Sequence, residues 1–243
     1  MRKSAFIIAV FLVAACGPKI NQAYKKSVDE LLAQHPDKSE NVPAPAELTP
    51  QPWTVGQWAL YKVTDKYGAG YERLSVVAQD DCGIWVETVR LSYAQKSVSK
   101  VCYERMPWDQ DVDAAVSEAI DLVKIMITQS EGNQPQVIDF RSGQGAGMKM
   151  LMKGVVKNMY FEWWLGDDRP RETVAVPAGS FADTVRVEAK MSLGIMSVKS
   201  TGWAHPAVPV NGSVKVVSKD YESVLLDFGQ EGARTELPDH GGK

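Results

Sequence analysis

The sequence predicts a mainly β fold with short helices (α+β), built on an antiparallel sheet of about eleven strands. Three observations lead to this prediction. From Trp53 onward, short runs rich in β-branched and aromatic residues are separated by glycine, asparagine and aspartate. Several runs alternate apolar and polar residues, which is typical of an antiparallel sheet with one solvated face. Helical patterns do not alternate regularly with these runs, as they would in a parallel β/α sheet.

The strand predictions follow from this alternation and from the turns. Val185 and Val187 point to one face of their run, whereas Arg186 and Glu188 point to the other. Turn sequences such as Asn211-Gly212 separate consecutive runs, as hairpins require. Strands are therefore expected at residues 57–64, 72–78, 84–92, 97–105, 122–129, 135–140, 171–176, 184–190, 195–203, 213–218 and 223–228.

Two segments break the β pattern. Residues 111–120 predict a short surface helix. Residues 148–160 predict an amphipathic, methionine-rich helix with lysines on its polar side, followed by a cluster of aromatic residues. Because methionine is flexible and polarizable, such a face adapts to lipids or other proteins. The alternative is that the helix packs on the sheet and the aromatic residues fill the core. The candidate ligand-binding residues are Met148, Leu151, Met152, Val155, Met159, Trp163 and Trp164.

The first residues have the pattern of an export signal. Two basic residues precede an apolar run at residues 5–15, which is about half the length that spans a bilayer. The run ends in small residues, and Leu12 to Cys16 resembles the lipobox of bacterial lipoproteins, in which the cysteine is acylated. We therefore expect residues 1–15 to be a lipoprotein signal peptide and Cys16 to carry the lipid. The alternative is an ordinary signal peptide that contains a cysteine.

Lipid on Cys16 would anchor the protein to a membrane, since two or more acyl chains bind a bilayer stably. The next residue is Gly17, whereas an aspartate there tends to retain lipoproteins at the inner membrane in enteric-type bacteria. That resemblance favours the outer membrane within the cell envelope. Without Arg2 and Lys3, the 27 basic residues fall to 25 against 30 acidic ones, a formal charge of −5. Nucleic acid is not an expected partner, because its binders carry a basic face or stripe.

Residues 16–52 are predicted to be a tether, because six of the thirteen prolines lie there. A short helix is expected before Pro36, either docked on the body or loose, with Ile20, Tyr24, Val28, Leu31 and Leu32 on one face. Residues 53–232 are expected to form one β-rich domain, and residues 233–243 a C-terminal tail.

Once Cys16 is lipidated, Cys82 and Cys102 remain. An even pair in an exported protein is compatible with a disulfide, and two buried thiols are the alternative. Two cysteines without nearby histidines are too few for a zinc site. The three histidines, His35, His205 and His240, are scattered, so no catalytic residue, metal site or cofactor is assigned and the chain is not expected to be an enzyme.

The segment Val176-Pro177-Ala178-Gly179-Ser180-Phe181 resembles a turn of certain uncharacterised bacterial envelope lipoproteins. The strands at Val55-Gly56-Gln57-Trp58 and Trp85-Val86-Glu87, and Leu226-Asp227-Phe228-Gly229 near the end, resemble theirs in the same order. Those proteins are similar in architecture to the LolA/LolB-type lipoprotein carriers. The resemblance implies a curved antiparallel sheet or half-barrel that wraps over one amphipathic helix and can hold acyl chains.

Two functions are consistent with this pattern. The first is an envelope lipoprotein that binds a lipid or other apolar ligand in the half-barrel. The second is a structural lipoprotein, or one that binds an envelope protein partner, with a closed core and no ligand.

Overall fold

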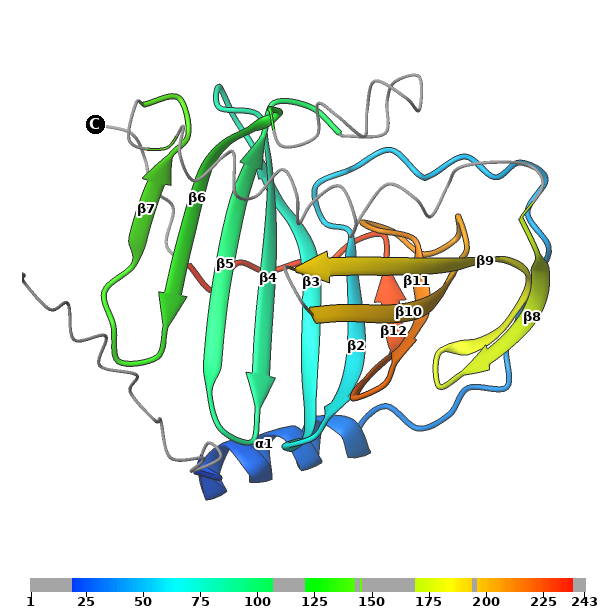
Figure 1. Cartoon of the computed structure of the whole chain (residues 1–243). Helices are drawn as coiled ribbons and strands as arrows, with labels where there is room; N and C mark the ends of the chain where they lie inside the picture. Colours follow the sequence, from blue (N-terminus) through cyan, green and yellow to red (C-terminus); the bar gives the residue numbers. More distant parts are fainter. Residues whose placement is uncertain (1–18, 107–120, 143–144, 146–168, 194–195, 238–243) are drawn as a thin grey trace, which may run out of the picture.

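The computed structural model describes residues 19–106, 121–142, 145, 169–193 and 196–237. These residues form one curved, twelve-stranded sheet with a single helix (Figure 1). The mainly β prediction is therefore confirmed. The helix is α1 (Gln22–Ala33), and the strands are β1 (Asn41–Val42), β2 (Trp58–Asp65), β3 (Gly68–Gln79), β4 (Ile84–Ser92), β5 (Lys96–Tyr103), β6 (Val123–Ser130), β7 (Gln136–Asp139), β8 (Arg171–Val176), β9 (Gly179–Leu193), β10 (Met196–Ala204), β11 (Ser213–Ser218) and β12 (Tyr221–Gly229).

Each of the eleven predicted strands is present, and β3, β9 and β12 are longer than expected. β3 begins at Gly68 rather than at residue 72, because Gly68 and Gly70 carry no side-chain signal for a strand. Glycine is required at position 70, since a Cβ there would lie 2.6 Å from the carbonyl oxygen of Leu91. β9 begins at Gly179 and contains Asp183 at φ 59°, a conformation that aspartate tolerates better than most residues.

The strand order is β1-β9-β10-β11-β12-β2-β3-β4-β5-β6-β7, and β8 pairs with β9. Every pairing is antiparallel except that of β1 with β9. Figure 1 shows β9 and β10 crossing in front of β2 and β3, nearly at right angles to them. The sheet therefore curls back on itself and has a concave face toward β9. The predicted helices at 111–120 and 148–160 lie outside the described residues, so the half-barrel that wraps over a helix stays a prediction.

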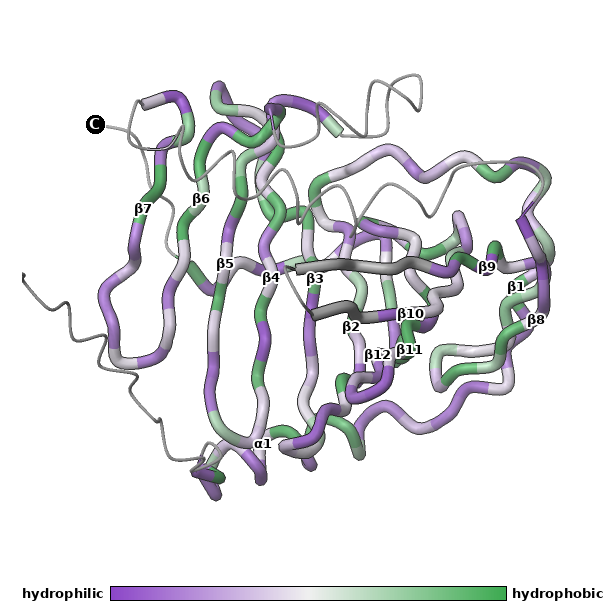
Figure 2. The backbone as a smooth tube through the Cα atoms, in the orientation of Figure 1, coloured by the Kyte–Doolittle hydropathy of each residue, from purple (hydrophilic) through white to green (hydrophobic). Residues whose placement is uncertain are grey.

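Apolar and polar residues alternate along the strands, as the bands of colour along β3 to β6 show in Figure 2. This alternation gives the sheet two apolar faces. The concave face carries the larger cluster, which includes Tyr61, Leu74, Val76, Phe181 and Leu225. The convex face of β4 to β6 carries a second cluster, built from Trp85, Val89, Val98, Cys102, Ile127 and Leu237.

The segment predicted as a tether packs on the sheet over the part that is described. The expected helix is present as α1, and Asn21 caps it by accepting hydrogen bonds from the amides of Ala23 and Tyr24. Farther on, β1 pairs with β9. A two-residue strand has no periodicity, so the sequence did not predict it.

The predicted C-terminal tail also begins inside the fold. Leu237 is only 1% exposed and belongs to the convex cluster, and Figure 1 shows the chain after β12 running behind β3, β4 and β5. The boundaries predicted at residues 52 and 232 therefore do not mark the limits of the packed body.

Candidate functional site

In the described part of the chain, one end of the sheet gathers four turns and the helix. The register places the turns at residues 65–68, 92–96 and 218–221 together, because Asp65 pairs with both Gly68 and Tyr221, and Gly70 pairs with Ser92. The turn at residues 131–135 lies beside them, because Ser130 pairs with Ser97. α1 lies against this end, beneath the turn between β4 and β5 (Figure 1). We call this region the hairpin end. The opposite end, where Trp58 pairs with Gly229, is called the far end.

Polar and apolar contacts together hold α1 at the hairpin end. The backbone N–H of Asn21 donates to the carbonyl of Tyr93 at 2.7 Å, and the Tyr93 hydroxyl donates to the Asp29 carboxylate at 2.9 Å. Val28 is fully buried on the face of the helix that packs on the sheet. Because these contacts fix Asn21, Asp29 and the apolar face, α1 is packed as part of the body.

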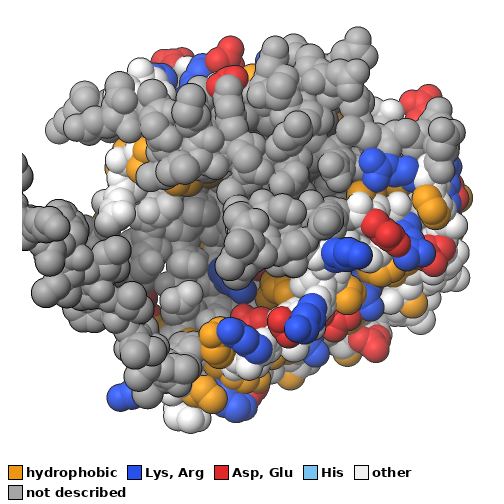
Figure 3. All heavy atoms as spheres, in the orientation of Figure 1, with side chains coloured by type: hydrophobic (Ala, Val, Ile, Leu, Met, Phe, Trp, Pro, Cys, Tyr) orange, Lys and Arg blue, Asp and Glu red, His pale blue; other side chains and the backbone are white. Residues whose placement is uncertain are grey.

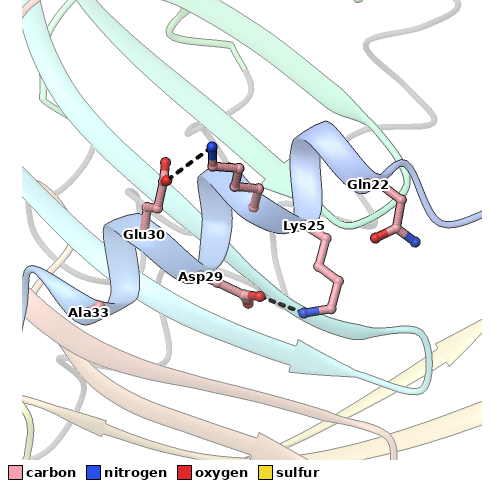
Figure 4. A pocket seen from close by; sticks show the side chains of 6 residues that line it. Gln22, Lys25, Asp29, Glu30 and Ala33 are labelled. Carbon is pink, nitrogen blue, oxygen red and sulfur yellow. Dashed lines mark hydrogen bonds and ion pairs between the residues drawn. The ribbon is translucent and has the colours of Figure 1, made fainter.

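Charges of both signs are mixed on the surface near this end. In Figure 3 the described side chains of lysine and arginine lie among those of aspartate and glutamate. Figure 4 shows an open hollow along α1, lined by Gln22, Lys25, Lys26, Asp29, Glu30 and Ala33. Lys25 pairs with Asp29, and Lys26 with Glu30, each one helical turn along. The charged groups that line the hollow are therefore paired within the helix.

The segment after α1 is tied to β12 and β9. Nδ1 of His35 lies 3.3 Å from the Asp227 carboxylate on β12, and the Lys38 ammonium donates to the same carboxylate at 2.6 Å. Two residues later, the carbonyl of Glu40 accepts from the amide of Ser180 at 2.9 Å, next to the pairing of β1 with β9. The path from α1 to β1 is therefore fixed by contacts to two strands.

The concave face is filled by the protein itself in the part that is described. Val208 and Val210, from the connection between β10 and β11, are 2% and 4% exposed and pack in the concave cluster. Phe181 at the start of β9 is fully buried beside them. Side chains from a loop and from the crossing strand therefore fill this part of the concave face.

Side chains from β2 and from the segment before it hold that loop in place. The Trp53 indole donates to the carbonyl of Val210 at 2.7 Å, and the Tyr61 hydroxyl contacts the Asn211 side chain at 2.8 Å. Val210 has φ 69°, which is uncommon and costly for a β-branched residue. Such strain persists only where surrounding contacts impose it, so the inward position of the loop is strongly specified.

His205 begins this loop and is 2% exposed. Its Nδ1 accepts from the amide of Ala207 at 3.1 Å, so Nε2 carries the proton and faces the carbonyl of Pro43 at 3.2 Å. Burial lowers the pKa of His205, against the opposing effects of the Pro43 and Ala182 carbonyls and the charge of Asp183. The neutral ring therefore joins the loop to the segment after β1.

A polar cluster occupies the concave face nearer the hairpin end. Glu72, Arg90 and Tyr221 come from three strands, and Arg90 also lies 3.7 Å from the Asp65 carboxylate. Burial raises the pKa of Glu72, and the charge of Arg90 opposes that effect. Burial also raises the pKa of Tyr221, helped by Glu72. Shifted pKa values occur both at functional sites and in structural networks of ion pairs. This cluster has the composition of a structural network.

The convex face contains a buried carboxylate that sequence reasoning missed. Glu87 is fully buried on β4 and accepts hydrogen bonds from the Thr235 hydroxyl at 2.6 Å and the Glu236 amide at 2.8 Å. The amide of Leu237 donates to it as well, at 3.2 Å. Lys100, also buried, lies directly across from Glu87 in the register of β4 and β5. The signal in the sequence is an acidic residue at an inward position of an otherwise apolar run.

Cys82 and Cys102 are joined by a disulfide, with their Cα atoms 6.4 Å apart. Cys82 lies in the turn between β3 and β4, and Cys102 pairs with Trp85 on β5. Asp80 lies close to both sulfurs, but its carboxylate accepts from the Cys82 amide and the Trp85 indole. With both sulfurs in a disulfide, this group has no thiolate ligand to offer a metal.

The remaining predicted site residues lie outside the described residues. These are the lipidation candidate Cys16 and the ligand-binding candidates Met148, Leu151, Met152, Val155, Met159, Trp163 and Trp164. Across the described part of the chain, no helix has the length and apolar character needed to span a membrane.

Comparison with known proteins finds no matching family model, no matching curated protein and no matching solved structure.

Proposed function

We propose that this protein is a lipid-anchored lipoprotein of the bacterial cell envelope, whose body is a structural or protein-binding module with a closed core. Lipid on Cys16 attaches it to a membrane, and the resemblance of its first residues to those of other lipoproteins favours the outer membrane. The body then presents its folded sheet to a partner in the envelope.

One observation supports a closed core over a carrier of acyl chains. Val208, Val210 and Phe181 fill the concave face where a carrier would hold its ligand. The neighbouring part of that face carries Glu72 and Arg90, and charged groups there disfavour apolar ligands. The alternative, a lipid or apolar ligand in the half-barrel, depends on the methionine-rich segment at residues 148–160.

Native mass spectrometry of the detergent-solubilised, full-length protein separates the two functions. A closed core predicts one species with the mass of the acylated chain and no further bound lipid. A stoichiometric, non-covalent lipid that survives mild detergent would overturn the closed core and favour the carrier.

Two variants in the methionine-rich segment extend this test. If that segment is part of a closed core, Leu151→Asp unfolds the protein by burying an unpaired charge, and Lys153→Glu leaves thermal stability and apolar-dye binding unchanged. A folded Leu151→Asp protein that has lost dye binding present in the wild type would instead identify a ligand site.

A further inference from the structure

We propose that the hairpin end of the sheet is a membrane-contact surface, and that its partner is the headgroup layer of the bilayer that holds the lipid on Cys16. This inference rests on the lipid attachment proposed above. It adds an orientation: α1 and the neighbouring turns face the membrane, and the far end faces away.

Few residues separate Cys16 from the packed body. Asn21 is already fixed to Tyr93, and it caps a helix that is packed on the sheet. Only residues 17–20 separate Asn21 from Cys16. A fully extended chain covers about 3.4 Å per residue, so Asn21 lies within about 17 Å of the lipidated residue. Residues 21–42 of the predicted tether thus contact the body, and four residues lie between them and Cys16.

The body is longer, from the hairpin end to the far end, than the headgroup layer is thick. β2 runs from the far end to the hairpin end over eight residues, and a strand rises about 3.3 Å per residue, so the two ends are separated by about 23 Å. The polar layer on each side of a bilayer is only about 7 Å thick. An anchor fixed beside α1 therefore brings the hairpin end to the headgroups and leaves the far end in water.

The exposed side chains at the hairpin end include types that are common at a membrane interface. Ile20 is 53% exposed just before α1, and Tyr67 is 46% exposed at the tip of the turn between β2 and β3. Lys66 lies over the Tyr67 ring at 4.8 Å, and the side chain of Lys26 is 76% exposed. Tyrosine and lysine are residues that sit at the membrane interface, where an apolar part enters and a polar tip stays wet.

The hairpin end does not share the acidic excess of the mature chain, because it has six lysines against five acidic residues. The lysines are Lys19, Lys25, Lys26, Lys66, Lys96 and Lys219, and the acidic residues are Asp29, Glu30, Asp65, Glu131 and Asp220. The acidic excess of the body therefore lies elsewhere, so this end can approach anionic headgroups without net repulsion.

A fluorophore placed at each end tests the orientation. Lys26→Cys places a thiol on α1, and Glu231→Cys places a matched, exposed thiol at the far end. With Cys16 acylated and the other two cysteines in a disulfide, each new thiol is the one reactive site, and unsubstituted protein serves as the labelling control. The full-length lipidated proteins are reconstituted in vesicles of phosphatidylethanolamine and phosphatidylglycerol that contain a headgroup-nitroxide lipid.

We expect the nitroxide to quench the fluorophore at position 26 at least threefold more strongly than the one at position 231. Equal quenching, or stronger quenching at position 231, in protein that floats with the vesicles would overturn the membrane-contact surface and leave the anchor intact. Wild-type protein that does not float with vesicles would instead overturn the lipid anchor itself, and with it this inference.

Discussion

A few buried polar residues determine how distant segments of this chain meet. Glu87 receives three donors from residues 235–237, and His205 joins the loop before β11 to Pro43. Neither role is visible in the sequence, because each depends on groups more than a hundred residues away. The sequence can show only that a polar residue stands in an apolar run. The disulfide partners were the exception, since the number of cysteines left two candidates for one bond.

Glu87→Ala should lower the free energy of unfolding by about 1–3 kcal/mol, because the amides of Glu236 and Leu237 lose their acceptor in a buried place. Glu131→Ala, at an exposed position in the turn after β6, should change it by less than about 0.5 kcal/mol. Urea unfolding measures both values. Equal effects of the two substitutions would show that Glu87 does not hold the C-terminal segment.

His205 should make stability depend on pH. The unfolded chain takes up a proton near the ordinary pKa of 6.5, whereas burial lowers the pKa of His205 in the folded protein. Its contribution is therefore complete above about pH 6.5 and is lost as the pH falls from there toward the lowered pKa. Comparing urea unfolding at pH 7.5 and pH 5.5 tests this point. The wild type should lose more stability between these pH values than His205→Gln, and an identical loss in both would contradict it.

The positions of the strands could largely be predicted from the sequence, whereas the packing of α1 and β1 on the sheet could not. The strands from β2 to β12 have strong alternation and clear turns, so local sequence was enough to place them. β1 is two residues long, and its pairing with β9 depends on contacts 139 residues apart along the chain, as between Asn41 and Ser180. The helix α1 followed from its apolar face, but proline content suggested a free tether. Proline limits local conformation and does not prevent packing on a distant surface.

Two substitutions on α1 test its docking. Val28 is fully buried against the sheet, whereas Ala33 is exposed on the same helix. Val28→Asp should release α1 from the body, because it buries an unpaired charge, and amide hydrogen exchange in residues 21–35 should then become much faster. Ala33→Asp should leave exchange unchanged. Slow exchange in the Val28→Asp protein would show that the helix is held by other contacts.

The disulfide should stabilise the body by closing a loop of 20 residues. Replacing Cys82 and Cys102 with serine together should lower the free energy of unfolding by about 3 kcal/mol. Alkylation of the unreduced, denatured wild-type protein checks the bond directly. Modification of both cysteines in that sample would mean that no bond had formed.

The described residues form one packed body, and the described segments before β2 and after β12 are folded onto it. Residues 21–42 lie along the hairpin end and the β9 edge, and residues 234–237 lie on the convex face. Val208, Val210 and Phe181 pack in the concave face of this body. With the lipid that we propose on Cys16, such a body suits work at one membrane surface, whereas a carrier needs an accessible apolar space.

Cys16 is proposed to be the lipidated first residue of the mature protein, and mass spectrometry of the N-terminal peptide from membrane-purified protein tests this proposal. We expect a peptide that begins at Cys16 and carries acyl chains, and the loss of that peptide when Cys16→Ser is expressed instead. A peptide containing Cys16 with a free thiol, or a mature chain that begins at another residue, would contradict the proposal.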